Sequence, residues 1–455
     1  MKHLPVVAIL VVTLLVGCQK ADTAEATTEI SPGGIEYVRL YMPDTEDVAI
    51  QIAWPSDWVM REDVNQAVPV LGTELILVGG ADEFPPGEVI EVYADLNAEG
   101  TLWVTTDHLH GQLIAPKDNL DRAVEIAAAH LSSPTMDSGW LQRIRQDSIS
   151  NMVETVSVPA NRGYEALRWV ILGDTPLRSA LTADEPEMYS TATREQILEW
   201  HRTTVIRDGA RIVVAGAIDA DLAGKAVDRL LSQLPKGNPV PLRAPKADFT
   251  ARRILLHVPE AQTSTLIFIG PLPPTRQGSE FEDVLLATAL GGDDNSVLFN
   301  AVRTGLRASY GFGAGIEAYT RDLRFLFLTG EVETGKLAEA EAVVRKAYEE
   351  FTEKAVMSEI LARKPSFEDH AEQTAKDPVS ASFSAMMALL DGRAPNLALT
   401  LPAVLSSVSE ETLRTRVESA FPSANSLIAL AVSPDATALP GACVVQAPAE
   451  AVKCR

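Results

Sequence analysis

An arginine and a tyrosine seven residues apart are the side chains in this sequence best suited to contact a bound peptide. Arg303 lies near the end of a segment with a helical pattern, and Tyr310 lies in the strand pattern that follows. A phenol can donate a hydrogen bond to a carbonyl oxygen as negative charge develops there, and a guanidinium can hold a neighbouring carbonyl. Two ordinary explanations stay open. The helix dipole favours an arginine in a last turn, and Tyr310 also fits a simple strand position.

The helix that carries Arg303 must position this pair. Glycines at 291–292 end one apolar helix, and Asn295 and Ser296 can cap the next. Apolar residues recur along that second helix with the spacing of one buried face, at Val297, Leu298, Ala301 and Val302. The pattern predicts that the helix ends near Gly305 and that a strand begins at about Arg307.

The same order of elements occurs twice along the chain. VLGTELILV ends in a glycine pair at 79–80, and VLLATAL ends in the pair at 291–292. A strand pair, an amphipathic helix, further helices and a buried strand follow in each copy, with RIVVAGAI as that strand in the first and SLIALAVS in the second. The repetition predicts an α+β fold of two homologous modules, each a mostly antiparallel sheet with helices packed on one face.

The module boundaries follow from the composition between the two copies. We expect residues 35–235 to form the first module and residues 250–438 the second. Residues 236–249 contain three prolines and are typical of a linker. Residues 439–455 are expected to form a C-terminal tail, in which an oxidising compartment would permit a disulfide between Cys443 and Cys454.

Composition and charge exclude some classes of protein. The chain has 455 residues, of which 46% are hydrophobic, and this is enough for two or more buried cores. A formal net charge of −23 argues against nucleic acid as a partner, because nucleic-acid-binding proteins need a basic face. No CxxC motif or Cys/His cluster is present, so a cysteine-based zinc site is not expected.

A pair of histidines, His108 and His110, would point the same way on a strand and therefore deserves a test as a metal site. Asp107 would face the opposite side of that strand, and no third ligand is visible in the sequence. We therefore predict no metal there.

The first 18 residues have the pattern of an export signal. Their apolar run at 6–16 is too short to span a bilayer. It ends in LVGC at 15–18, which resembles a bacterial lipobox and implies cleavage before Cys18 and lipid on its thiol. Gln19, in place of an aspartate, then favours the periplasmic side of the outer membrane, with residues 19–34 as a flexible tether. An ordinary signal peptide with a chance cysteine is the alternative.

The segment GGDDNSVLFNAVR, with the tyrosine at Tyr310, resembles the pitrilysin/insulinase metallopeptidase family, in the branch with two homologous modules per chain. RIVVAGAIDADL with its following helix, and TTDHL from Thr105, match the family in the same order, so the resemblance covers roughly residues 35–435. Active members of the family carry H-x-x-E-H in the first module, just before the glycine stop. Its two histidines hold zinc and its glutamate activates a water, with a further glutamate ligand downstream.

The sequence departs from the family at this zinc motif. Val70 falls at the first histidine, Thr73 at the catalytic base and Glu74 at the second histidine. The region of the third ligand reads Gln146-Asp147-Ser148, without a glutamate. One or two carboxylates do not make the usual zinc site, so we expect no metal cofactor in this chain.

The second module keeps the Arg303 and Tyr310 positions that the family uses to contact substrate. In two-chain members of the family, one chain holds the zinc and the other holds the Arg/Tyr pair, and this sequence resembles the second kind. The resemblance implies a subunit that is inactive alone, supplies Arg303 and Tyr310 to a zinc-bearing homologous partner, and acts on peptides. It would meet the membrane only through its lipid anchor. An inactive scaffold and an independent peptide-binding lipoprotein of the same fold are the alternatives.

Overall fold

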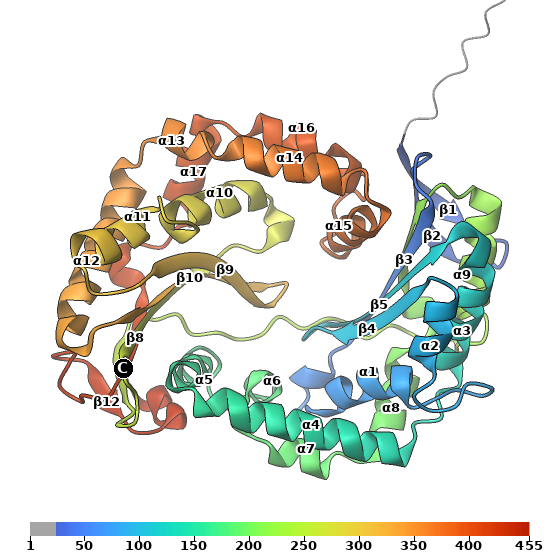
Figure 1. Cartoon of the computed structure of the whole chain (residues 1–455), viewed down its shortest axis with the longest axis horizontal. Helices are drawn as coiled ribbons and strands as arrows, with labels where there is room; N and C mark the ends of the chain where they lie inside the picture. The colour runs from blue at the N-terminus through green and yellow to red at the C-terminus, as the bar shows by residue number, and fades with distance from the viewer. Residues whose placement is uncertain (1–23, 455) are drawn as a thin grey trace, which may run out of the picture.

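The computed structural model describes residues 24–454, and these form two α+β modules placed side by side (Figure 1). The modules are related by an approximate twofold axis along the line of sight in Figure 1, so that α1 corresponds to α10 and α5 to α15. The predicted signal peptide, Cys18 and the first residues of the predicted tether lie outside the described part of the chain. No helix within residues 24–454 is long and apolar enough to cross a bilayer.

The N-terminal module has a six-stranded sheet in the order β1-β2-β6-β3-β5-β4, antiparallel except for the β2–β6 pair. Its strands are β1 Glu25–Ile30, β2 Glu36–Tyr41, β3 Asp47–Pro55, β4 Glu99–Val104, β5 His108–Pro116 and β6 Arg211–Gly216. Its helices are α1 Val68–Val78, α2 Val89–Asp95, α3 Leu120–Ser132, α4 Ser138–Ser157, α5 Pro159–Leu172, α6 Pro176–Leu181, α7 Glu187–Thr191, α8 Arg194–Thr204 and α9 Ala220–Leu231.

The C-terminal module repeats this plan with the order β12-β7-β11-β8-β10-β9, in which β7 pairs in parallel with both β11 and β12. Its strands are β7 Arg253–His257, β8 Ser264–Leu272, β9 Phe312–Thr320, β10 Leu323–Val332, β11 Ile428–Ser433 and β12 Cys443–Val445. Its helices are α10 Glu280–Gly291, α11 Val297–Phe299, α12 Leu337–Lys354, α13 Met357–Leu361, α14 Lys364–Thr374, α15 Pro378–Leu390, α16 Leu397–Ser407 and α17 Glu410–Ala420, and a π-helix covers Asn300–Gly305. The predicted α+β fold of two homologous modules is confirmed.

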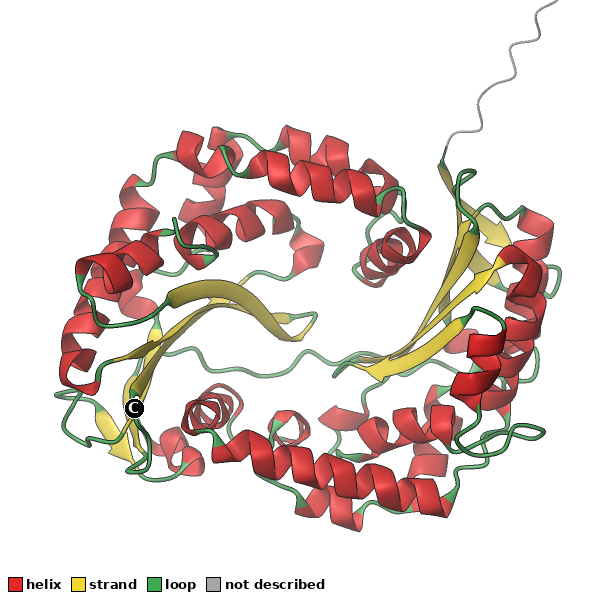
Figure 2. Cartoon of the chain, viewed as in Figure 1, coloured by secondary structure: helices red, strands yellow, loops and turns green. Residues whose placement is uncertain are grey.

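Each module's own helices cover one face of its sheet, and a helix from the other module covers the second face (Figure 2). Helix α5 of the N-terminal module packs on β8 and β11 of the C-terminal sheet. Helix α15 of the C-terminal module packs on β3 and β6 of the N-terminal sheet. Gly163 permits the first contact, since a Cβ there would lie 2.7 Å from a methyl group of Val432. The prediction of helices on one face did not include this exchange.

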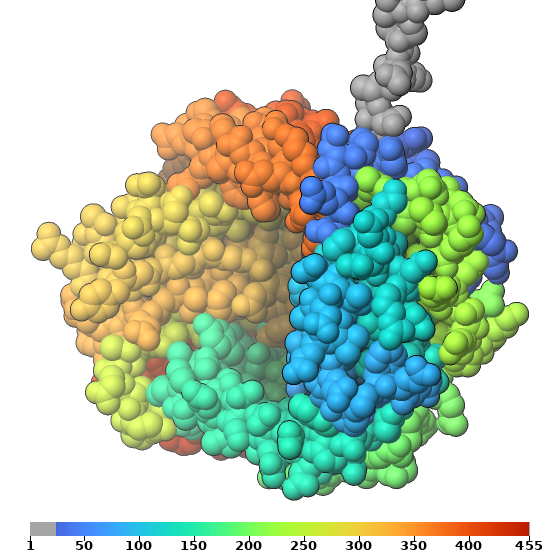
Figure 3. All heavy atoms as spheres, turned by 45° about the vertical axis from the view of Figure 1, so that its right-hand side comes forward, coloured from blue at the N-terminus to red at the C-terminus, as the bar shows by residue number. Residues whose placement is uncertain are grey.

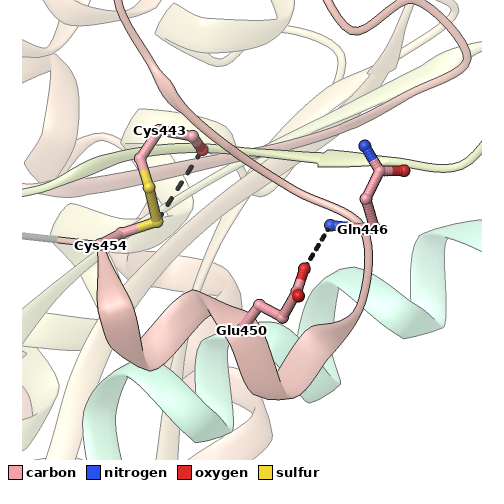
Figure 4. Close-up of a disulfide and its surroundings, with 4 residues drawn as sticks. All are labelled: Cys443, Gln446, Glu450 and Cys454. Atoms are coloured by element: carbon pink, nitrogen blue, oxygen red, sulfur yellow. Dashed lines mark hydrogen bonds between the residues drawn. A yellow bond between two sulfur atoms is a disulfide. The ribbon is translucent and has the colours of Figure 1, made fainter.

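The two ends of the described chain are built into the sheets. Residues 25–30, predicted as part of a flexible tether, instead form β1, which pairs with β2 along its whole length. The backbone N–H of Gly33 donates to Asp228 of α9 at 2.7 Å, which fixes the turn after β1. The predicted tail at 439–455 likewise contains β12, and Cys443 and Cys454 are joined by a disulfide (Figure 4). Both expectations missed short edge strands, β1 paired with β2 and β12 paired with β7.

The linker at 236–249 has no helix or strand and crosses between the modules (Figure 1). It therefore connects two cores that also exchange helices, so the modules are held together by packing as well as by the chain.

Candidate functional site

Helix α1 carries the three positions of the degenerate zinc motif. Gly72 lets α1 approach α8 closely, since a Cβ there would lie 2.6 Å from the Trp200 ring. This contact turns Val70 and Glu74, one helical turn apart, away from the core, and both are exposed. Thr73 is buried, and its hydroxyl donates to the Pro69 carbonyl at 2.6 Å. The Thr73 hydroxyl is therefore already occupied by the helix backbone.

Asp147 of α4 lies close enough to α1 to act on Glu74. Partial desolvation raises the pKa of Glu74, and the negative charge of Asp147 raises it further. The two carboxylates thus occupy neighbouring positions on packed helices. Sequence reasoning left open whether Asp147 faces this region; α4, which carries it, packs on α1.

Arg303 and Tyr310 lie together on one surface loop of the C-terminal module. Helix α11 continues into the π-helix, and Arg303 in that π-helix lays its guanidinium over the Phe299 ring, 5.0 Å from its centre. Its Nη1 donates to the backbone carbonyl of Tyr310 at 2.7 Å. The side chain of Tyr310 is 89% exposed. The predicted helix end at Gly305 agrees with the structure, whereas the strand begins at Phe312, five residues later than the expected Arg307.

Hydrogen bonds hold this loop at several points. Lys336 Nζ donates to the Arg307 carbonyl at 2.9 Å, and the Ala308 N–H donates to the Val302 carbonyl at 3.2 Å. Arg307 has a positive φ of 54°, which is uncommon for a residue with a side chain. The Ser309 hydroxyl bonds to the backbone of Gly311 in both directions, at 2.7 and 3.0 Å. The backbone therefore fixes the direction in which Tyr310 projects, and π-helical turns of this kind are frequent at functional sites.

A central cavity of about 610 Å³ lies between the two modules. Val70 of α1 lines it, together with the ends of β4 and β5, the turn between β9 and β10, and α15. None of the residues between 291 and 311 lines this cavity. Figure 3 shows the molecule hollowed between the modules on the face turned to the viewer. The degenerate zinc motif and the Arg303–Tyr310 loop thus lie at separate places in this chain, on opposite sides of the view in Figure 1.

The turns of two equivalent hairpins meet at one wall of the central cavity. Thr106, between β4 and β5, donates to the Tyr319 carbonyl, and Asp107 accepts from the Arg321 N–H at 3.2 Å. The Arg321 guanidinium donates to the Met387 carbonyl at 2.8 Å and pairs with Asp391 of α15 at 2.6 Å. Arg321 therefore ties the hairpin of its own module to both α15 and the N-terminal module.

The two histidines of β5 face α15 and are buried. Contrary to the prediction that Asp107 faces the other side, its carboxylate contacts His108 Nδ1 at 2.9 Å, because Asp107 precedes the strand and the alternation of side chains does not extend to it. Burial opposes ionisation of Asp107, but hydrogen bonds from His108 and Thr105 and the charge of His108 outweigh it and lower its pKa to about 2. Burial lowers the pKa of His110 to about 4, and its Nδ1 has no hydrogen-bond partner in the described chain.

Comparisons with known proteins found one family match and several similar folds. Residues 191–364 match the model of the peptidase M16 inactive domain. A peptidase M16 inactive domain from Pseudomonas fluorescens superposes with a TM-score of 0.76 at 13% identity, over 93% of this chain and all of that one. Residues 191–364 thus match a domain of the M16 (pitrilysin/insulinase) family, the chain as a whole shares the fold of an M16 domain, and α1 lacks the family's zinc motif. No curated protein sequence matches it.

Other proteases share the fold at low identity. A protease from Helicobacter pylori has a TM-score of 0.74 and 12% identity, over 90% of this chain and all of that one. The periplasmic protease PqqL from Escherichia coli has a TM-score of 0.70 and 15% identity, over 94% of this chain but only 50% of PqqL. The chain thus has the fold of about half of PqqL.

The zinc of active M16 peptidases does not fit the residues present on α1 and α4. Val70 has no lone pair to donate, and Glu74 and Asp147 supply only two carboxylates. Structural and catalytic zinc sites need three or four nitrogen, sulfur or oxygen ligands. No group of three histidine, cysteine, aspartate or glutamate side chains within residues 24–454 is arranged to hold a metal.

Sequence reasoning did not find the meeting of the two hairpin turns or the role of Arg321. The only sequence signal is that both turns contain a short polar segment, Thr105-Thr106-Asp107 and Arg321-Asp322, at equivalent places in the repeat. Polar turns are common on protein surfaces, so this signal does not indicate contact between modules.

Proposed function

We propose that this chain is the non-zinc-binding subunit of a two-chain peptidase and that it supplies Arg303 and Tyr310 to a zinc-bearing homologous partner. One observation carries the proposal: Tyr310 is 89% exposed on a loop whose backbone is fixed, while α1 retains no zinc ligand set. A large aromatic side chain that is exposed to solvent is typical of a surface that binds another molecule.

The proposed chemistry of the pair follows from its free donors. Arg303 uses Nη1 on the Tyr310 carbonyl, which orients the guanidinium and leaves further N–H groups for a peptide carbonyl. The Tyr310 hydroxyl would donate to a carbonyl oxygen as it becomes an oxyanion. Loss of one such donor costs enzymes about 3–4 kcal/mol of transition-state stabilisation.

The length of this chain relative to PqqL supports the proposal that it works with a second peptidase chain. This chain covers about half of PqqL, so a full-length protein of that kind contains two such halves in one chain. A separate half needs a second chain to form the same assembly. We further propose that lipid on Cys18 anchors the complex to the periplasmic side of the outer membrane. Because β1 begins at Glu25, only residues 19–24 would then separate the lipidated Cys18 from the first strand, fewer than the predicted tether at 19–34.

The test compares this chain alone with the chain bound to its partner. Residues 19–455, with the lipidated cysteine left out, are assayed for zinc content and for cleavage of an internally quenched unstructured peptide. The same assay is made on complexes purified from its own cells with a tagged chain. We expect no zinc and no cleavage alone, and chelator-sensitive cleavage when a chain with H-x-x-E-H is present.

The variant Tyr310→Phe decides whether the pair takes part. It removes one hydroxyl from an exposed side chain, so folding and complex formation should not change, whereas kcat of the complex should fall about 100-fold or more. An unchanged kcat with a stable complex would refute the role of Tyr310 and favour an inactive scaffold. Zinc-dependent cleavage by the lone chain would refute the proposed division of labour.

A further inference from the structure

The loop that presents Tyr310 is held from outside by the connection between β10 and α12. Lys336 Nζ donates to the carbonyl of Arg307 at 2.9 Å, and the Glu333 N–H donates to the carbonyl of Ala308 at 2.8 Å. Ala308 is buried and packs in the core of the C-terminal module. Both hydrogen bonds therefore act on the backbone just before Tyr310, from a segment that is distant in the sequence.

The backbone at Arg307 needs support of this kind. Its φ of 54° lies in the left-handed region, where the Cβ of any residue other than glycine is crowded against the following carbonyl. The hydrogen bond from Lys336 forms only while the Arg307 carbonyl points toward the ammonium, so it favours this conformation over those that turn the carbonyl away. Tyr310 follows three residues later, and its direction depends on the conformation at Arg307.

Lys336 does not lie where a lysine stabilises its own helix. It precedes the first residue of α12, and the N-terminus of a helix carries the positive end of the dipole, which disfavours a cation. Its ion pair with Glu333, at 3.1 Å, joins side chains that are 35% and 62% exposed, and exposed pairs contribute little to stability. The contact with the Arg307 carbonyl therefore explains this lysine better than the helix or the ion pair does.

We propose that Lys336 is a positioning residue of the two-chain peptidase. Its ammonium fixes the backbone at Arg307 and thereby the direction in which the Tyr310 hydroxyl meets the peptide. This inference rests on the proposed function, since it takes Tyr310 as the group that contacts the peptide. Lys336 acts through Tyr310, while its ammonium is held by the Arg307 carbonyl and by Glu333.

Hydrogen exchange of the lone 19–455 chain, followed by mass spectrometry, measures the support that Lys336 gives the loop. Lys336→Met keeps a long side chain but removes its donors. The amides at 306–311 should then exchange about 10-fold faster, as expected for the loss of one hydrogen bond from a charged donor near the surface. Lys346→Met, at an exposed position of the same helix, is the matched control and should leave this exchange unchanged.

The purified two-chain complex shows whether this support matters for the reaction. Lys336→Met should lower kcat about 10-fold and leave KM unchanged, because it disturbs a group that acts in the transition state. Lys336→Arg, whose guanidinium can also donate to a carbonyl, should recover most of this loss. In a Tyr310→Phe background, Lys336→Met should lower kcat no further, because no hydroxyl remains to be positioned.

Circular dichroism checks that each variant is folded, and Lys336→Ala takes the place of Lys336→Met if that variant is not. Unchanged exchange at 306–311, or a loss of kcat that adds to the loss in Tyr310→Phe, would overturn the positioning role and leave the proposed function standing. If Tyr310→Phe alone leaves kcat unchanged, the proposed role of Tyr310 is refuted, and the role of Lys336 in the reaction with it.

Discussion

The exchange of helices between modules can be tested at Gly163 of α5. In an isolated helix, Gly163→Ala would stabilise by about 1 kcal/mol, because alanine loses less backbone entropy than glycine. In this protein the new Cβ would lie 2.7 Å from Cγ2 of Val432 and 3.2 Å from Cδ1 of Ile267. Val432 is 1% exposed and has a stiff β-branched side chain, so it cannot move aside easily.

The clash should outweigh the gain in helix propensity. Overpacking of a close-packed core costs about 1–3 kcal/mol. Subtracting about 1 kcal/mol of propensity leaves a net destabilisation of up to about 2 kcal/mol. Val432→Ala alone should cost about 2–3 kcal/mol because it opens a cavity. The double variant should cost less than the sum of the two by about 1 kcal/mol or more, because the alanine at 163 then has room.

Urea unfolding of the 19–455 chain, followed by circular dichroism, measures these differences. Gly335→Ala is the control, since a Cβ at that glycine meets nothing within 4 Å and its φ is not positive. A Gly163→Ala variant that is more stable than the wild type, with additive effects in the double variant, would mean that α5 does not pack on β11. The exchange of helices would then be wrong.

Three other changes should have measurable effects. Asp283→Asn should lower the unfolding free energy by about 3–5 kcal/mol in urea titrations, because fully buried Asp283 neutralises Arg416 at 2.6 Å and Arg324 at 3.2 Å. His110 has its pKa lowered from 6.5 to about 4 by burial, so the unfolded chain takes up a proton first as the pH falls. The unfolding free energy should therefore drop by about 3 kcal/mol between pH 6.5 and pH 4, and His110→Gln should lose this part of the pH dependence of melting. The triple variant Val70→His, Glu74→His and Asp147→Glu places two histidines on α1 and a glutamate on α4. It should bind zinc in a calorimetric titration, whereas the wild type should not.

The sequence predicted the order of elements because amphipathic spacing and glycine stops are local signals. The apolar residues of α5, for example Leu167 and Val170, indicate that this helix is buried. They do not indicate which sheet it covers, because an apolar face fits either sheet and only the assembled chain decides between them. The same limit applies to Asp107, whose contact with His108 depends on a turn that strand alternation does not describe.

The spacing of Arg303 and Tyr310 identified the candidate site, but it did not predict how the loop holds them. The π-helix at Asn300–Gly305 has the same residue types as an α-helix, so its wider turn leaves no pattern in the sequence. The bond from Arg303 to the carbonyl of Tyr310 depends on this turn and on the positive φ of Arg307. Local backbone geometry of this kind becomes visible only in the structure.

The twofold relation of the modules explains why a single chain cannot bring the two halves of the proposed site together. It places α1, at the central cavity, and the Arg303–Tyr310 loop, outside that cavity, on opposite sides of the molecule (Figure 1). A helix exchange in both directions and the contact of Arg321 with the other module's turn join the modules and hold α1 and the loop apart in this structure. Under the proposed function, a peptide at α1 of one chain would therefore meet an Arg/Tyr pair of a second chain. Loss of the zinc ligands would leave the proposed role of Arg303 and Tyr310 intact, because their loop is held by contacts within the C-terminal module.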